Sequence, residues 1–171
     1  ILAEYRRVLG RCSHIGAWQL ALECHICMAK QDLPRDARAY RQVITALKKS
    51  PVAVPIQVTV AVLDEMIAEG LATHSTFHIC IGAIARTPKS WRHAVLVFGK
   101  MRKAGHKASS ATYEVLTQAC VEADPTDAYD ALKFAGVPEF FAYSISRRAL
   151  ERRAEKKQRA IEREGQRLLS S

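Results

Sequence analysis

The sequence is poor in glycine and proline, and it lacks any long uncharged hydrophobic run. Eight Gly and six Pro among 171 residues are too few for a collagen-like or a Pro/Gly-rich low-complexity chain. No segment approaches the roughly 18–20 uncharged apolar residues that span a bilayer. We therefore expect that the chain is not an integral membrane protein and has no membrane partner. No signal or transit peptide is recognisable. Ile1 rather than Met opens the sequence, and we expect a processed chain or part of a longer one.

Catalytic motifs are also missing from the sequence. There is no Ser/His/Asp order, no H-E-x-x-H, no Walker A loop and no G-x-G-x-x-G. The six histidines have no companion carboxylate pattern. We therefore predict a protein that is not an enzyme, with no cofactor and no small-molecule substrate.

The five cysteines are odd in number and dispersed, which favours a reducing or organellar interior over a secreted disulfide framework. Cys24 and Cys27 form a Cys-x-x-Cys, and with Cys12 and His14 a four-ligand zinc site can be drawn. No second Cys or His pair follows at zinc-finger spacing, and free Cys is a common small core residue. We favour packing over metal binding and predict no metal site.

What the sequence does have is apolar content and positive charge. Hydrophobic residues make up 49% of the chain, enough to bury a core. The formal net charge is +9, which favours an acidic partner, with nucleic acid first among the candidates.

An aromatic residue opens four segments that continue with helical spacing. The aromatics are Tyr5, Tyr40, Phe77 and Tyr113, separated by 35, 37 and 36 residues. The residues three, four and seven positions further on are mostly apolar, which is typical of one face of an α-helix. The sequence therefore predicts a helix at the start of each unit of an internal repeat.

A second set of helices is predicted between the first ones, each with a Met ten residues after its opening residue. The pairs are Trp18 and Met28, Ile56 and Met66, and Trp91 and Met101. Because Met and Trp recur at equal places, we expect them to pack in the core. Gly70 and Gly105 suit the left-handed residue that closes a helix. Pro55 suits the first turn of the middle helix, which favours helix over strand for the β-branched run around it.

The pattern weakens after Cys120. We expect a shortened second helix at Asp127–Phe134, ending near Gly136, and a final segment from Pro138. Four apolar side chains of that segment can pack on the last repeat: Phe140, Phe141, Tyr143 and Ile145. From Arg147 onward the chain carries nine Lys/Arg against four Asp/Glu, and we predict a long polar helix with little core contact.

Together, the opening aromatics, the Trp-x-x-Ala-(Leu/Val) blocks, the Met four residues before Gly and a period slightly above 34 resemble the pentatricopeptide repeat (PPR) family over roughly residues 2–136. Tetratricopeptide repeats share the architecture, but their period is 34. The resemblance implies an all-α fold, a right-handed α-solenoid of helix-turn-helix repeats, here with a long basic C-terminal helix. It divides the chain into repeats at 2–36, 37–73 and 74–109, a partial repeat at 110–136 and a basic extension at 137–171.

The PPR resemblance also implies where bases would be read. The base-selecting residues directly after the aromatics are Arg6, Arg41, His78 and Glu114, and those that end the repeats are Asp36, Thr73 and Ser109. The residues that would sandwich a base are Ala3, Arg38, Ser75 and Ala111. The family uses Asn, Ser or Thr directly after the aromatic and Val at the sandwiching place, and this chain departs from both. Since Arg prefers phosphate to a base edge, we expect contact with the RNA backbone instead of base-by-base reading.

We therefore predict an RNA-binding surface on the first repeats and the basic tail. Its residues are Arg6, Arg38, Arg41, His78, Arg147, Arg148, Arg152, Arg153, Lys156, Lys157, Arg159 and Arg163. The predicted function is a non-catalytic subunit of a mitochondrial ribonucleoprotein, with the mitochondrial ribosome as the expected setting. It would contact rRNA through charge and neighbouring proteins through helix faces. Two alternatives stay open: an organellar RNA-processing, editing or stability factor that binds single-stranded RNA, and a tetratricopeptide-type scaffold without RNA contact.

Overall fold

The computed structural model describes the backbone of residues 1–169 and the side chains of residues 1–167. Within these residues the chain forms nine α-helices and no strand, so the all-α prediction is confirmed. The helices are α1 (Leu2–Ile15), α2 (Trp18–Lys30), α3 (Ala37–Lys49), α4 (Ile56–Ala68), α5 (His74–Ala85), α6 (Trp91–Lys103), α7 (Ser110–Cys120), α8 (Pro125–Phe134) and α9 (Glu139–Leu169). None of the helices in the described part of the chain is both long and apolar enough to cross a membrane.

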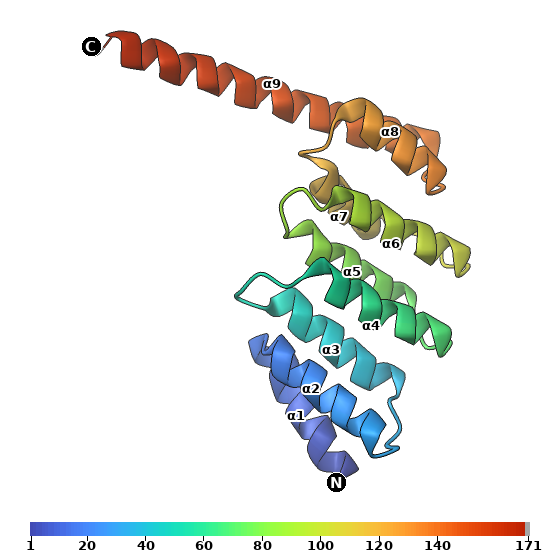
Figure 1. Ribbon diagram of the computed structural model, residues 1–171. Helices are drawn as coiled ribbons and strands as arrows, with labels where there is room; N and C mark the ends of the chain where they lie inside the picture. The colour runs from blue at the N-terminus through green and yellow to red at the C-terminus, as the bar shows by residue number, and fades with distance from the viewer. Residues whose placement is uncertain (170–171) are drawn as a thin grey trace.

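The helices follow one another in pairs along the molecule, with the N-terminus at one end and α8 and α9 at the other (Figure 1). The odd-numbered helix of each pair also packs on the next odd-numbered helix: α1 on α3, α3 on α5 and α5 on α7. These four helices form a row, and α2, α4 and α6 pack beside it. Neighbouring helices of the row therefore belong to successive predicted repeats.

Three helices of the row begin with the same hydrogen-bonded cap. The side chains of Asp36, Thr73 and Ser109 accept hydrogen bonds from the backbone N–H groups of Ala39, Thr76 and Thr112. Such a cap satisfies one of the backbone donors that a helix start leaves without a partner. The helices beside the row begin at Trp18, Ile56 and Trp91, where the sequence predicted them. Pro55 lies one residue before α4 and not in its first turn.

The ends of the four even-numbered helices repeat one geometry. The backbone N–H···O=C pairs are Leu33 to Met28 (2.9 Å), Leu71 to Met66 (3.0 Å), His106 to Met101 (3.1 Å) and Val137 to Leu132 (2.9 Å). The residue before each donor has a positive φ: Asp32 (51°), Gly70 (70°), Gly105 (82°) and Gly136 (82°). This is the Schellman closure. The left-handed conformations predicted for Gly70 and Gly105 are confirmed, whereas Asp32 takes this conformation without glycine.

The core runs along the whole stack. Met28, Met66 and Met101 are fully buried, as predicted, and so are the aromatic rings of Tyr40 and Phe77. Four of the five cysteines are buried side chains in the same core, namely Cys12, Cys24, Cys80 and Cys120. One hydrophobic cluster joins residues from every helix, so burial of a single continuous apolar interior holds the helices together.

The last two helices differ from the expectation in detail. α8 begins at Pro125, two residues before the predicted start, because Asp124 supplies a cap that accepts from the backbone N–H groups of Thr126 and Asp127. Of the four apolar side chains expected to pack at the start of α9, Ile145 is buried. Phe141 is 37% exposed and stacks on Tyr113, with ring centroids 4.1 Å apart.

The packing prediction was wrong for Phe140 and Tyr143, which are mostly exposed. Tyr143 lines a shallow surface pocket with Pro125 and Tyr129 of α8 but is not buried there. From Leu150 to Arg167 every side chain is exposed, so the prediction of a polar helix with little core contact is confirmed. At 1.5 Å per residue, the 31 residues of α9 extend ~46 Å, and the helix projects well past the other helices (Figure 1). Residues 170–171 of the predicted basic extension lie outside the described part of the chain.

Candidate nucleic-acid interface

Helix α3 carries four basic residues and no acidic residue. Arg38, Arg41 and Lys49 are exposed and Lys48 is half-buried, while the opposite side of the helix is buried in the core. At about 100° per residue, positions 38, 41, 48 and 49 fall on one side of an α-helix. We call Arg38, Arg41, Lys48 and Lys49 the α3 cation strip. No residue of the strip has an ion-pair partner among the described side chains.

Positive charge also extends over the helices on either side of α3. Arg7 and Arg11 are exposed on α1, which packs directly on α3, and neither has an ion-pair partner among residues 1–167. On the other side, the Lys48 side chain extends over α5. A Cβ atom placed on Gly82 would lie 3.6 Å from Lys48 Nζ, so the absence of a side chain at Gly82 leaves room for Lys48 on the α5 surface. Positive charge thus extends from α1 over α3 to the edge of α5.

Arg6 was predicted to bind RNA, and the structure pairs it with an acid. Arg6 Nη2 donates to Asp36 Oδ2 at 2.8 Å, and both side chains are about half exposed. Asp36 Oδ1 accepts from the N–H of Ala39 at 2.9 Å and caps α3. Arg6 and Asp36 are the two base-selecting positions that the PPR resemblance assigns to the first repeat. Their side chains therefore bind each other and a helix end.

His78 lies half-buried on α5, and its Nδ1 atom is buried without a hydrogen-bond partner. Burial lowers the pKa of His78, and the nearby positive charges of Lys48 and His74 lower it further. A lowered pKa leaves the imidazole neutral at pH 7. The predicted contribution of His78 to a cationic surface is therefore small at neutral pH.

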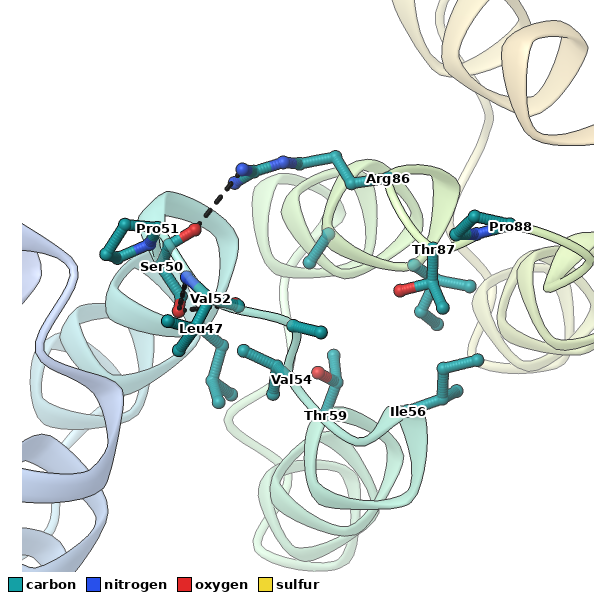
Figure 2. Close-up of a pocket in the computed structure, with 13 residues that line it drawn as sticks. Leu47, Ser50, Pro51, Val52, Val54, Ile56, Thr59, Arg86, Thr87 and Pro88 are labelled. Carbon is teal, nitrogen blue, oxygen red and sulfur yellow. Dashed lines mark hydrogen bonds between the residues drawn. The ribbon is translucent and has the colours of Figure 1, made fainter.

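The end of α3 also engages an arginine from the next repeat. The Arg86 guanidinium donates to the backbone carbonyl oxygens of Lys48 and Ser50, the latter at 3.2 Å. A cation at this place donates hydrogen bonds to carbonyl groups that have no partner within the helix. It also interacts favourably with the negative end of the helix dipole. Figure 2 shows the contact of Arg86 with Ser50 at the rim of a small pocket between the α3–α4 loop and the α5–α6 turn. The volume of this pocket is about 220 Å³. Arg86 is the single charged residue in its lining, so the pocket offers no acid–base pair for catalysis.

Four predicted cations of α9 bind carboxylates. Arg147 and Arg152 pair within the helix, with Glu151 at 2.9 Å and Glu155 at 3.8 Å. Arg153 and Lys156 bind the segment that joins α7 to α8: Arg153 Nη1 lies 2.5 Å from Asp124 Oδ2, and Lys156 Nζ lies 2.6 Å from Glu122 Oε1. Hydrogen bonding to these cations lowers the pKa of both Glu122 and Asp124. Arg153 and Lys156 thus attach the base of α9 to the last repeat.

The remaining predicted residues of the tail are exposed and, among residues 1–167, have no ion-pair partner. These are Arg148, Lys157, Arg159 and Arg163. They lie on a helix that projects from the stack (Figure 1). The structure therefore divides the predicted surface into two separate basic regions, the α3 cation strip with its α1 neighbours and the exposed half of α9.

The Cys-x-x-Cys on α2 does not form a metal site in the described residues, where no three His, Cys, Asp or Glu side chains are grouped to hold an ion. Cys24 is buried and its thiol donates to the carbonyl oxygen of Tyr5 at 3.7 Å, whereas Cys27 is exposed. Burial raises the pKa of Cys24, and the neighbouring Cys12 and Cys27 raise it further.

No model of a known protein family matches the chain, and no curated protein matches it either. The site must therefore be judged on its own residues. Sequence reasoning selected Arg38 and Arg41 but omitted Lys48 and Lys49. The signal was present, because Lys48 lies seven residues after Arg41 and ten after Arg38, which is the spacing of one helix face. The compensation of Arg6 by Asp36, 30 residues away, was not visible from local spacing.

Proposed function

We propose that this protein is a non-catalytic RNA-binding subunit built as a right-handed α-solenoid of the pentatricopeptide kind. The observation that carries the proposal is the α3 cation strip, four basic residues on one side of one helix with no acidic partner in the described part of the chain. Like charges on one side of a helix repel each other and lower the stability of the fold when no acidic side chain pairs with them. A phosphate backbone removes that cost and supplies most of the affinity in electrostatic RNA binding.

The residues in the strip favour contact with phosphate over reading of bases. Arg and Lys bind phosphate oxygens through charge-assisted hydrogen bonds. The three predicted repeat-ending selectors, Asp36, Thr73 and Ser109, all cap helices of the row with their side chains. A side chain that caps a helix is not free to select a base without loss of that cap. These contacts support recognition of RNA by shape and charge.

The repeated geometry supports the solenoid class. Four helix ends share the Schellman closure, and three helix starts share one type of cap. Each row helix packs on the next, as nearest-neighbour packing in repeat proteins requires. The mitochondrial ribonucleoprotein setting, with the ribosome first, follows from the PPR resemblance. Sedimentation of the tagged protein from mitochondrial lysate tests that setting: co-migration with ribosomal subunits that is lost after ribonuclease treatment supports it, and slow free sedimentation refutes it.

Salt dependence tests the RNA interface directly. Each phosphate contact on a single strand contributes about −0.7 to the slope of log K against log salt. Four contacts give a slope of about −2.8, or an affinity loss of about fiftyfold between 50 and 200 mM salt. The measurement is fluorescence anisotropy of a labelled oligouridylate.

A double variant and a matched control locate the contacts. Arg38→Gln with Arg41→Gln should reduce the magnitude of the slope by about 1.4, so that the same change in salt costs about sevenfold less affinity than it costs the wild type. Lys30→Gln with Lys107→Gln removes the same charge from exposed positions outside the strip and should leave the slope near its original value. Equal effects of the two double variants, or binding that is insensitive to salt, would contradict the proposed interface.

A further inference from the structure

A second surface lies on the other helices, in a groove between α6 and α8. Its volume is about 680 Å³, and its lining combines small and apolar residues with four basic residues and no acidic residue. Two large apolar side chains in the lining are exposed: Phe134 at 96% and Leu96 at 51%. An apolar groove with exposed large side chains is a common feature of protein interaction sites.

The floor of the groove is made by small residues where the helices approach each other. A Cβ atom placed on Gly99 would lie 3.7 Å from the Cβ of Ala135, which places the α6 backbone close to the end of α8. Ala131 lies one turn before Ala135 and also lines the groove. Leu96 and Phe134 therefore flank a shallow floor that has no bulky side chain to fill it.

The fold does not require either apolar side chain. Phe134 lies two residues after Leu132, whose carbonyl oxygen closes the Schellman motif. The same place in the three earlier repeats holds Lys30, Ala68 and Lys103, and those helices end with the same geometry.

Leu96 shows the same departure. It lies five residues after Trp91, which begins α6. The equivalent positions after Trp18 and Ile56 hold Glu23 and Ala61, and both are exposed. Two exposed apolar residues thus meet in one groove at positions that other repeats fill with charged or small residues.

Positive charge in the lining is only partly compensated. Arg92 pairs with Asp127 at 2.9 Å, and Lys100 pairs with Asp64. Arg102 and Lys103 are exposed at the end of α6, and neither has an ion-pair partner among the described side chains. A partner that fits the groove must therefore present both an apolar surface and negative charge.

We propose that the groove between α6 and α8 binds an acidic amphipathic helix of a partner protein. The apolar face of that helix would cover Leu96 and Phe134, and its carboxylates would pair with Arg102 and Lys103. A groove between two helices suits the ridge of a third helix. RNA fits this lining less well, because Phe134 is its one aromatic side chain and the aliphatic floor offers nothing to sugar or phosphate. The inference concerns other helices than the α3 cation strip and does not depend on the proposed function.

The test uses the full chain and a small panel of fluorescein-labelled helical peptides with Leu on one face and Glu on the other. The Leu residues are spaced three or four apart, so that both registers are sampled. A matched panel carries Lys in place of Glu, and a labelled oligouridylate represents RNA. We expect the Glu peptides to bind and the Lys peptides to bind at least about tenfold more weakly.

Two variants and two controls assign the binding to the groove. Phe134→Ala should weaken the Glu peptide at least about tenfold, whereas Phe140→Ala, which truncates an exposed Phe outside the groove, should have no effect. Lys103→Glu should weaken the peptide about fivefold. Lys30→Glu changes the equivalent last residue of α2 and should not. Thermal unfolding should be unchanged by Phe134→Ala, since the side chain is exposed.

Four results would overturn the proposal. These are no binding of any Glu peptide up to about 1 mM, equal binding of the Lys panel, equal effects of the groove variants and their controls, and a loss of oligouridylate binding on Phe134→Ala without a loss of peptide binding. The last result would assign the groove to RNA.

Discussion

The contact between α1 and α3 gives a sharp test of the packing that positions the α3 cation strip. Gly16 closes α1 with φ of 75°, and its N–H donates to the carbonyl oxygen of Cys12 at 2.9 Å. A Cβ atom on Gly16 would collide with the backbone carbonyl of Lys49 and lie 2.7 Å from its carbon atom. Because the obstacle is backbone and not a flexible side chain, Gly16→Ala must push α1 away from the end of α3.

Gly105 provides the matched control for this substitution. Its φ is 82°, and nothing lies within 4 Å of a Cβ atom built there. Gly105→Ala should cost only the left-handed conformation, about 1–2 kcal/mol. Gly16→Ala should cost that amount and an overpacking penalty of about 1–3 kcal/mol. A total of about 2–5 kcal/mol is a large part of the stability of an ordinary domain.

Urea unfolding followed by far-UV circular dichroism measures both free energies. The m value must agree among wild type and variants, because a change would mean that the first repeat unfolds separately. The free energy of unfolding of Gly16→Ala should be lower than that of Gly105→Ala by the overpacking penalty of about 1–3 kcal/mol, and its urea midpoint should be lower accordingly. Equal destabilisation by the two substitutions would mean that the backbones of α1 and α3 do not approach as the structure describes, and the reasoning would fail.

Three further predictions concern titration, thiol reactivity and charge. Burial lowers the pKa of His25, as does the nearby Arg35, so the unfolded chain binds the proton more tightly and stability should fall as pH drops below about 6.5. Urea midpoints from pH 8 to 5 should show a step that His25→Asn reduces, with His78 contributing the remainder because its pKa is lowered as well; a step left unchanged by His25→Asn would contradict the role of His25. Burial raises the pKa of Cys120 to about 12, whereas Cys27 is exposed, so a thiol reagent at pH 8 should modify one cysteine quickly; a fast phase that survives Cys27→Ser would contradict this. Asp36→Asn can keep the helix cap but frees Arg6 from its ion pair. The RNA affinity should therefore rise, and the slope of log K against log salt should steepen by about 0.7. The control Asp127→Asn frees a cation on α6 instead and should change neither the affinity nor the slope.

The helices were predictable because apolar residues recur at helical spacing wherever one face of a helix is buried. Trp18, Ile56 and Trp91 mark helix starts in the sequence and in the structure, since the same face of each helix must enter the core. Ends marked by glycine were equally readable, because Gly70 and Gly105 tolerate a positive φ that other residues resist. The end of α2 was hidden, since Asp32 takes that conformation with an ordinary side chain.

Charge compensation was not predictable from single helices. Arg6 and Asp36 are 30 residues apart, Arg153 and Asp124 are 29 apart, and Lys156 and Glu122 are 34 apart. Each distance is close to one repeat, because these pairs join neighbouring units of the stack. Local spacing shows pairs at three or four residues, as it did for the tail, but not pairs one period apart. Which cations remain unpaired, and so define the candidate surface, was decided by these contacts between repeats.

Comparison of the repeats with one another separates what the fold needs from what it leaves free. The caps at Asp36, Thr73 and Ser109 differ in residue type but share one role, so each of these places holds a side chain that the helix start uses. Arg38 occupies a position that is Ala3 in the first repeat and Ser75 in the third, and none of the three is buried. Packing therefore sets no requirement for charge there, and the same holds for Phe134 at a position that is otherwise Lys or Ala. A residue that departs from its repeat equivalents without a packing reason is a candidate for contact with a partner outside the chain. On this argument we propose a polyanion as the partner of the α3 cation strip and an apolar, acidic surface as the partner of the groove between α6 and α8.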